Sequence, residues 1–266
     1  ITWYINGKIV ASGRGVTTYS FTVGPMGSSD AIRALVSTSS GITKDVSKII
    51  RPAQIHLTWI ADSYTPAWYR GAGLPLPGSE IRIIALPDFR IGNVQINPAE
   101  LIYDWRWDDN QVGTNSGTGK NIYSFKFSDM EDTSYKISVR IKDAGERIVQ
   151  EEKIYVQAYR MRPLFYEIDD SAGLKTWRAA TNPAVPGGGE ISLQFEPFYV
   201  SIADFRKIKF QWTVNGVKLD NINSRNRTLR LIADPGNSGN QSVKVDFENP
   251  KNLLRQGSAT MNVKIN

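Results

Sequence analysis

The sequence predicts an all-β protein made of repeated β-sandwich modules, and three observations support this prediction. A short apolar alternation that contains a tryptophan and ends in a turn pair occurs three times. Short runs that alternate apolar and polar residues follow one another between turn residues, as half-buried strands do. No stretch shows convincing helical periodicity, and the 266 residues suit two to three modules of about 100 residues each.

The tryptophan repeat defines the length of a module. Trp105 follows Trp3 by 102 residues, and Trp212 follows Trp105 by 107. Internal repetition at a nearly fixed period is the signature of an array of similar modules. We therefore expect these three tryptophans to lie in three module cores. The turn pairs that end their strands are Asn6-Gly7, Asp108-Asp109 and Asn215-Gly216.

The middle segment, residues 52–162, contains the pattern of one whole module. About seven short strands, turn signals between them and a buried tryptophan in the third strand are typical of an immunoglobulin-like sandwich. Trp105 lies in the third predicted strand, with Tyr103 and Trp107 on the same side at period two. The predicted strands are Ile55–Ala61, Glu80–Leu86, Leu101–Trp107, Ile122–Phe127, Tyr135–Ile141 and Ile148–Val156.

The last segment, residues 163–266, repeats the same order of strands. Both segments follow an Arg-Pro pair, Arg51-Pro52 and Arg162-Pro163. A proline just before a strand fixes φ and leaves little slack, so we predict tandem sandwiches arranged as a rod. The predicted strands are Leu164–Ile168, Glu190–Phe195, Ile208–Val214, Thr228–Ile232, Ser242–Phe247 and Ala259–Ile265.

The first segment, residues 1–51, is predicted to be the C-terminal part of a module. Only two residues precede Trp3, so the first strands of a module are missing, and a partial sheet should not be stable alone. Two alternatives follow. The missing strands lie upstream in a longer protein, or a neighbouring subunit supplies them by β-strand addition, which makes a filament. The predicted strands are Ile1–Ile5, Tyr19–Val23, Ala31–Ser37 and Val46–Ile50.

These motifs resemble those of a known family. Tandem repeats with Trp-x-Ile/Val-Asn-Gly, or Tyr-x-Trp-x-Trp-Asp-Asp over Tyr103–Asp109, resemble the PKD and related Ig-like modules of bacterial cell-surface proteins. The sequence lacks the Trp-Asp-Phe-Gly-Asp-Gly run of a strict PKD domain, so Ig-like describes it better. The resemblance implies an extracellular spacer, adhesin or fibre component that acts through protein or glycan contacts. It also extends to proteins that accompany bacterial pili.

Composition excludes several function classes. The chain is 41% hydrophobic and 22% charged, as folded globular proteins are, and no apolar run is long enough for a membrane-spanning helix. It has no cysteine, which excludes disulfides and thiolate metal sites. Its net charge of +6 is spread along predicted strands rather than clustered, and this argues against nucleic-acid binding.

No catalytic site is predicted. His56 is the single histidine, and without a G-x-S-x-G motif it is interpreted as an ordinary strand residue. Gly117-Thr118-Gly119-Lys120 resembles a phosphate-binding loop. However, Asn121 stands where a Ser or Thr would hold magnesium, and a strand follows instead of a helix, so we expect a flexible loop. We therefore expect a protein that is not an enzyme and needs no cofactor.

Calcium is the metal that the sequence leaves open. Asp108-Asp109-Asn110 occupies the place of the Asn-Gly turn pairs, where φ > 0 is tolerated, and turn chemistry is the first interpretation. The alternative is a calcium ion held by these oxygens together with Asp104, since hard cations prefer several oxygen ligands. The same two interpretations apply to Asp129, Glu131 and Asp132.

The long loop between the first two strands is the main candidate for an interaction site. Structureless loops of this length are uncommon in compact domains and are often binding loops. Three interpretations are open: the tryptophan covers an open sandwich edge, contacts a neighbouring module or subunit, or stacks on a sugar ring. The candidate residues are Tyr64, Trp68, Tyr69 and Arg70 in residues 62–79, and Trp177 and Arg178 in residues 169–189.

The predicted function is a non-enzymatic structural or adhesive role on the outside of a bacterial cell, as a multi-domain spacer or filament component. The expected partners are neighbouring Ig-like domains or other protein subunits, including self-assembly by strand addition, and surface glycans. The alternative function is a set of carbohydrate-binding modules attached to a larger secreted enzyme. Fold analogy alone does not decide between them.

Overall fold

The computed structural model describes residues 1–130, 133–236, 238–250 and 252–266, with only the backbone for 252–255. The chain divides into two compact units. The first unit comprises residues 1–59, 82–124 and 134–156, and the second comprises residues 60–81, 125–133 and 157–266. This division follows neither of the predicted module limits, after residues 51 and 162, so those limits stay predictions, as does the rod arrangement.

Strands dominate the described chain, and the predicted all-β class is confirmed. The helical part of the described residues is one short helix, α1 (Ile202–Phe205), with two 3-10 turns, η1 (Pro98–Glu100) and η2 (Gly113–Asn115). The Ser201 hydroxyl caps α1 by accepting a 3.1 Å hydrogen bond from the backbone N–H of Asp204. Such short helices carry no periodic pattern that a sequence could display.

Residues 54–157 form two main sheets, in the orders β10-β9-β13-β14, with β11 on β9, and β12-β6-β5. Side chains from both sheets are fully buried, among them Trp105 from β9 and Ile83 from β6. A small hairpin, β7 (Arg90–Ile91) and β8 (Val94–Gln95), accompanies them. The strands are β5 (Gln54–Ala61), β6 (Glu80–Asp88), β9 (Ile102–Trp107), β10 (Asn110–Gln111), β11 (Gly117–Thr118), β12 (Ile122–Lys126), β13 (Ser134–Lys142) and β14 (Val149–Gln157).

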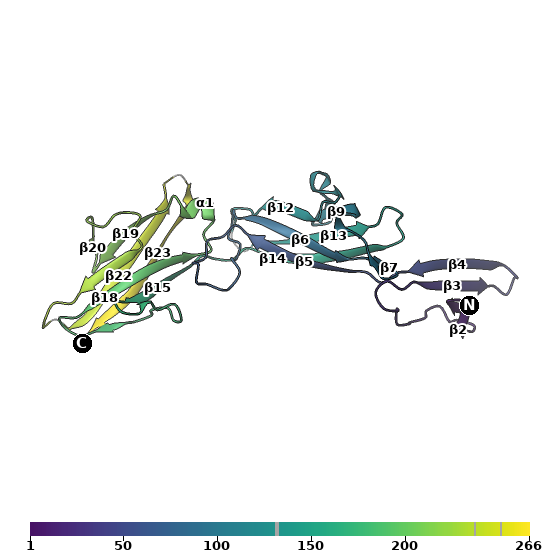
Figure 1. The fold of residues 1–266 in the computed structure, drawn as a ribbon, viewed down its shortest axis with the longest axis horizontal. Helices are drawn as coiled ribbons and strands as arrows, with labels where there is room; N and C mark the ends of the chain where they lie inside the picture. The colour runs from purple at the N-terminus through teal and green to yellow at the C-terminus, as the bar shows by residue number, and fades with distance from the viewer. Residues whose placement is uncertain (131–132, 237, 251) are drawn as a thin grey trace. The chain divides into compact units, whose positions relative to one another are not determined.

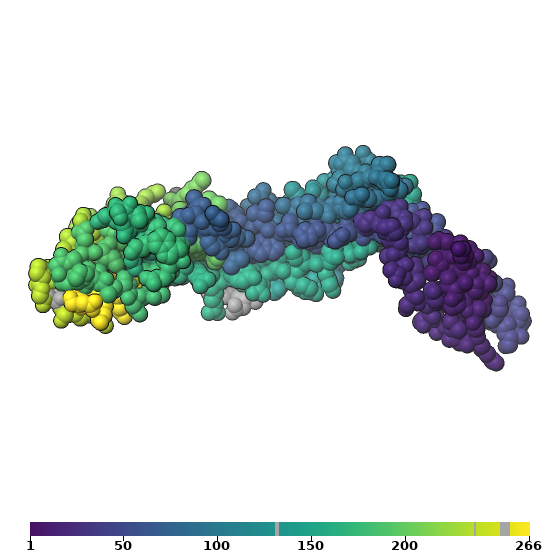
Figure 2. Space-filling view, turned by 60° about the horizontal axis from the view of Figure 1, so that its bottom comes forward, coloured from purple at the N-terminus to yellow at the C-terminus, as the bar shows by residue number. Residues whose placement is uncertain are grey.

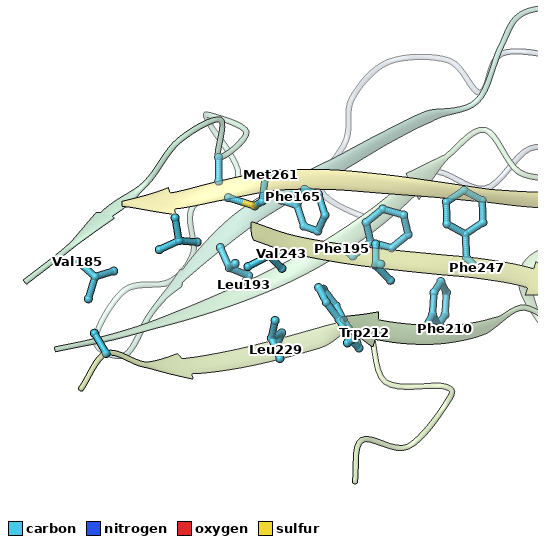
Figure 3. Close-up of a cluster of buried hydrophobic side chains, with 14 of the residues drawn as sticks. Phe165, Val185, Leu193, Phe195, Phe210, Trp212, Leu229, Val243, Phe247 and Met261 are labelled. Atoms are coloured by element: carbon cyan, nitrogen blue, oxygen red, sulfur yellow. The ribbon is translucent and has the colours of Figure 1, made fainter. Parts of the chain in front are cut away.

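Residues 162–265 form a second pair of sheets, in the orders β16-β15-β18-β21 and β17-β23-β22-β19-β20 (Figure 1). Phe165 and Phe195 from one sheet pack with Trp212 and Phe247 from the other, and these rings form the centre of the core (Figure 3). The strands are β15 (Arg162–Asp169), β16 (Gly173–Leu174), β17 (Ala184–Val185), β18 (Glu190–Phe198), β19 (Lys209–Val214), β20 (Val217–Lys218), β21 (Thr228–Ile232), β22 (Gly239–Asn249) and β23 (Asn252–Ile265).

The N-terminal sheet is a single layer in the order β2-β1-β3-β4 (purple in Figures 1 and 2). Across β1 and β3, Trp3 pairs with Ala34 and Ile5 with Ile32, so these four side chains share one face. Val46, which pairs with Ala34 on that face, is 54% exposed. The strands are β1 (Thr2–Ile5), β2 (Lys8–Ser12), β3 (Asp30–Ser37) and β4 (Thr43–Ile50).

Two strand predictions for this segment are wrong. The sequence pattern misses β2, which completes a hairpin directly after the Asn6-Gly7 turn. Tyr19–Val23 is predicted as a strand and is irregular instead. In the other two segments the equivalent strands, β12 and β21, pair with β6 and β18. Residues 1–51 contain no equivalent of β6 or β18, so Tyr19–Val23 lacks the neighbour that would satisfy its ladder.

Each of the three repeated tryptophans forms the same kind of hydrogen bond. Each indole Nε1–H donates to the backbone carbonyl of a residue 13 to 15 positions later. Trp105 and Trp212 are fully buried, whereas Trp3 is only partly buried. Trp3 differs from its predicted core position because it lies on a single-layer sheet. The donor–acceptor pairs are Trp3 with Val16 (3.0 Å), Trp105 with Lys120 (2.8 Å) and Trp212 with Asn226 (3.1 Å).

The turn after each tryptophan strand is also repeated. Its first residue has a positive φ, and its side-chain oxygen accepts a hydrogen bond from the backbone N–H of a residue in or just before a later strand. Asn and Asp tolerate this left-handed conformation, and their side chains bond local backbone groups. The members are Asn6 (φ 49°) with Ala31 at 2.8 Å, Asp108 (φ 45°) with Lys136 at 3.2 Å, and Asn215 (φ 49°) with Ser242 at 2.9 Å.

Candidate interaction surfaces

The loop over residues 62–79 is paired to the chain segment that follows β18. The backbone N–H of Tyr64 donates to the carbonyl of Val200 at 2.6 Å, and the N–H of Tyr199 donates to the carbonyl of Tyr64 at 2.8 Å. Ser63 and Ser201 form an isolated antiparallel bridge beside them. The loop was expected to lack regular structure, yet its first residues extend a β-type pairing, and the segment belongs to the second unit.

Tyr64 takes part in a buried ionic cluster. Its hydroxyl donates to Oε2 of Glu196 at 2.8 Å and accepts from Nη1 of Arg227 at 2.9 Å. Arg227 also forms an ion pair with Glu196, whose side chain is 1% exposed, and Gln194 donates to the other carboxylate oxygen. A buried carboxylate is stable only when its charge is paired and its lone pairs are used, and this cluster does both.

The ring of Tyr64 is stacked as well. It lies parallel to Phe205, with a centroid separation of 3.7 Å, and the guanidinium of Arg227 lies 5.7 Å and 5.2 Å from the centres of the two rings. Burial and then the neighbouring Glu196 carboxylate raise the pKa of Tyr64 to about 12. The hydroxyl therefore remains a hydrogen-bond donor to Glu196 at physiological pH.

Trp68 and Tyr69 cover an aromatic patch formed by Tyr166, Phe198 and Tyr199. Trp68 meets Tyr166 and Phe198 edge-on, at centroid distances of 5.0 Å and 5.9 Å. Tyr69 meets Phe198 edge-on at 5.2 Å, and its hydroxyl lies 3.0 Å from that of Tyr199. Of the three interpretations of this loop, the geometry matches contact with a following sandwich, because Tyr166 and Phe198 belong to β15 and β18.

The sequence pattern does not identify the residues that contact the loop. These residues are Glu196, Arg227, Phe205 and Tyr199. The one sequence signal for this site is Glu196 itself, a carboxylate in the largely apolar stretch from Leu193 to Val200, because a carboxylate there needs a buried partner. Arg70, the remaining candidate in the loop, is exposed.

The second candidate loop is arranged differently. Its backbone runs back along β15, with the N–H of Lys175 donating to the carbonyl of Glu167 at 2.9 Å and that of Ala180 donating to Phe165 at 2.7 Å. Trp177 projects from this segment with 74% of its surface exposed, and Arg178 beside it is exposed too. The repeated tryptophan of the two loops therefore has two environments, one docked and one open.

The carboxylates of the acidic turn Asp108-Asp109 bond to the neighbouring residue Lys136. Asp108 and Asp109 both have positive φ, and Asp109 forms an ion pair with Lys136 at 2.6 Å, which lowers the pKa of Asp109. These contacts match the turn interpretation. Within the described residues no group of three or more His, Asp or Glu side chains is arranged to hold a metal ion, and Glu131 and Asp132 lie outside the described residues.

His56 and the stretch Gly117–Lys120, the remaining motifs that resemble catalytic sites, occupy structural positions. His56 is an exposed residue of β5. Gly117 and Thr118 form β11, which pairs with β9, so this stretch is not the flexible loop that was expected. The carbonyl of Lys120 accepts the indole hydrogen bond of Trp105. Among the described residues, no helix is long and apolar enough to cross a membrane.

Comparison with known proteins gives remote structural likenesses. No family model matches the chain, and no curated protein matches it. Fibronectin(III)-like modules of Clostridium thermocellum CbhA are 13% identical, with 78% of this chain and 94% of that chain covered and a TM-score of 0.26. Extracellular domains 3–5 of Drosophila OTK are 10% identical, with 100% and 84% covered and a TM-score of 0.27.

A third likeness is to SGBP-B of the Bacteroides ovatus mixed-linkage glucan utilization locus, solved with a mixed-linkage heptasaccharide. It is 13% identical, covers 100% of this chain and 59% of that chain, and has a TM-score of 0.24. Likenesses this remote carry no argument about what the chain binds. The paired sheets themselves decide the fold class. The chain is a tandem array of immunoglobulin-like β-sandwich modules.

Proposed function

We propose that this array is a non-enzymatic structural element of a bacterial cell surface, a spacer or filament component that acts through protein–protein contacts. One observation carries the proposal: the partly buried side chains of Tyr64, Trp68 and Tyr69 in the loop between β5 and β6 pack against residues of β15 and β18. Aromatic anchors around a buried ion pair are typical of permanent protein contacts.

The buried polar groups support the same proposal. The carboxylate of Glu196 is held by Tyr64 and Arg227, and the carboxylate of Asp143, which is 3% exposed, accepts from Arg147 and from the backbone N–H of Ile148. Both buried carboxylates therefore have hydrogen-bond partners within the chain and stabilise the folded structure. A surface element needs such rigid contacts because its function is mechanical continuity.

Surface exposure tests the proposal. Intact cells of the producing bacterium are treated with a protease that cannot enter them, and the protein is followed with an antibody. We expect the protein to be cleaved while a cytosolic control protein survives, and electron microscopy of the shed material to show rods or fibres. Recovery of the intact protein only after lysis, in the soluble fraction, would contradict a surface role.

The single-layer N-terminal sheet supports self-assembly as one route to a filament. Ile9, Ile42 and Val46 are all more than half exposed, and the sheet ends in the edge strands β2 and β4. Unpaired edge strands favour pairing with another chain. In sedimentation velocity we expect association that increases with protein concentration and that Val46→Lys reduces. A Val217→Lys variant, changed at an exposed position of β20, is the matched control. A monomer at every concentration argues for the spacer role instead.

A further inference from the structure

Trp177 is the most exposed large apolar side chain in the part of the chain that the structure describes, at 74%. A tryptophan carries a large apolar surface, and leaving it open forfeits the free energy of burial. Its backbone is nevertheless held on both sides, by the hydrogen bonds of Lys175 to Glu167 and of Ala180 to Phe165. An exposed indole on a fixed backbone is pre-organised for binding.

A groove of about 400 Å³ lies beside this segment, and Lys175, two residues before Trp177, lines it. The volume falls within the range of about 300–1,000 Å³ of small-ligand sites. Carboxylates are the most frequent charged groups of the lining, the hydroxyls of Ser171 and Ser192 add polar groups, and apolar side chains such as Ile168 and Ile191 complete it. The charged lining residues are Glu167, Asp169, Asp170, Glu190 and Lys175.

The carboxylates keep free acceptor positions. Glu167 uses Oε2 for its ion pair with Lys175, and Glu190 uses Oε2 for Arg230, so Oε1 of each remains as an acceptor. The Asp170 carboxylate interacts electrostatically with Arg230. An ionised carboxylate only accepts hydrogen bonds, so a ligand that fits the groove must carry hydrogen-bond donors.

We propose that Trp177 and this groove bind a neutral oligosaccharide. A pyranose ring has an apolar C–H face that stacks on an indole, and the hydroxyls around its edge donate to carboxylate oxygens. The groove lined by Lys175, two residues before Trp177 in the chain, supplies those acceptors. The inference rests on the proposed surface role, because a glycan would then be one of the contacts that the array makes with its surroundings.

Charge and polarity decide against other ligand classes. Hydrogen bonds from the Ser171 hydroxyl and from the backbone amides of Ala172 and Ser171 lower the pKa of Asp169 to about 2, so it is ionised. Four carboxylates line the groove, and Lys175 and Arg230 pair with two of them, so the remaining negative charge repels acidic sugars and nucleic acids. A protein interface needs a contiguous apolar centre. The loop neighbours of Trp177 are Thr176 and Arg178, which are polar.

The test uses the whole chain and isothermal titration with cello-, laminari-, manno- and chito-hexaose. We expect at least one of these neutral sugars to bind, and Trp177→Ala to weaken that binding by about tenfold or more, the loss of one aromatic hot spot. Trp177→Phe should retain most of the affinity because it keeps a stacking face. Asp170→Asn should weaken binding less than Trp177→Ala.

Val217→Ala is the matched control, because Val217 is 66% exposed on β20 of the other sheet of the same sandwich. It should leave sugar binding unchanged. Three results overturn the inference: no hexaose binds at millimolar concentration, Trp177→Ala binds as the unchanged chain does, or an acidic oligosaccharide is preferred. Capture of a protein through Trp177 without sugar binding overturns it too. None of these results bears on protease cleavage at the cell surface, which tests the surface role separately.

Discussion

The indole N–H of a tryptophan that is removed from water needs a hydrogen-bond acceptor, and Trp3, Trp105 and Trp212 all find one of the same kind. A backbone carbonyl beyond the next turn accepts the hydrogen bond at 2.8–3.1 Å. Burial without that acceptor would cost the desolvation of the N–H. The tryptophan spacing could be predicted from the sequence, but the accepting residues Val16, Lys120 and Asn226 could not. Any backbone carbonyl is able to accept, so no side chain marks these positions.

Stability should follow the burial of each tryptophan. Trp212→Ala removes a fully buried indole and is expected to cost about 3–5 kcal/mol. Trp3→Ala should cost clearly less, since Trp3 is only partly buried. The exposed Trp177→Ala, within about 0.5 kcal/mol of the unchanged chain, is the control. Urea unfolding measures all three, and equal losses for Trp3 and Trp212 would contradict the difference in burial.

The buried Glu196 makes Arg227 important for the second unit. Arg227→Ala leaves the carboxylate with Tyr64 and Gln194 but without a counter-charge, and is expected to cost about 3 kcal/mol. Arg227→Ala combined with Glu196→Gln should recover part of the loss, because no unpaired charge is then buried. Thermal unfolding of the two variants provides the comparison. A double variant no more stable than Arg227→Ala would show that the charge is not the cause.

The same cluster predicts an alkaline dependence of stability. The folded-state pKa of Tyr64 is raised to about 12, above the ordinary value of 10.0, so the folded state holds the hydroxyl proton more tightly than the unfolded state. This contribution is complete below pH 10 and is lost as the pH rises from 10 towards 12. Tyr64→Phe should reduce the steepness of that loss. An identical profile for Tyr64→Phe, measured by denaturant titration at each pH, would argue against this role.

At the level of elements, strand alternation was the dependable signal. The alternation predicts β9 and β13 to within one residue at each end, and β18 and β22 with errors of up to three residues. In β18 the error lies at its C-terminal end, where Phe195–Phe198 are all buried and the alternation is lost. β2 was missed because a hairpin partner this short shows no periodicity of its own. The docking of residues 62–79 was also beyond the sequence, since the pairing of Tyr64 with Val200 and Tyr199 joins backbone groups far apart along the chain.

The docked loop is an element of the second unit's surface. In Trp68→Ala/Tyr69→Ala we expect Tyr166, Phe198 and Tyr199 to become exposed, with more binding of a fluorescent hydrophobic dye and a lower unfolding temperature. The replacement removes two large rings and leaves the backbone pairing of Tyr64 in place. Arg70→Ala, at an exposed position of the same loop, is the control. Equal dye binding by both variants would mean that the patch is not covered by these rings.

The repeated turns are a second element whose conformation decides stability. Asn215→Ala loses the hydrogen bond to the backbone N–H of Ser242 and places alanine at φ 49°, and is expected to cost about 1–2 kcal/mol. Asn215→Gly loses the bond but accepts the conformation, so it should cost less. Chemical unfolding ranks the two variants. Equal losses in the two variants would show that the missing side-chain hydrogen bond, rather than the backbone conformation, dominates.

At the level of the whole molecule, the N-terminal sheet is the weakest part. It has one layer and large exposed apolar side chains, whereas β22 and β23 pair over most of their length in a closed core. Local opening should therefore be easiest in residues 2–50. Hydrogen exchange read by mass spectrometry should show those amides exchanging well before the amides of β22. Slow exchange throughout residues 2–50 would imply that something covers the sheet in solution.

The place of residues 62–79 has a consequence for anyone who wishes to rearrange this protein. A fragment started at Pro163 would have a correct set of strands but would lack the segment that its own surface is shaped to receive. The sequence repeat begins at Pro163, whereas the compact second unit also includes the loop over residues 62–79. Swapping modules at Pro163 would therefore separate Tyr64 from Glu196 and Trp68 from Tyr166, and a successful chimera needs its cut before β5, so that the sheet β12-β6-β5 and the loop stay with the strands that they contact.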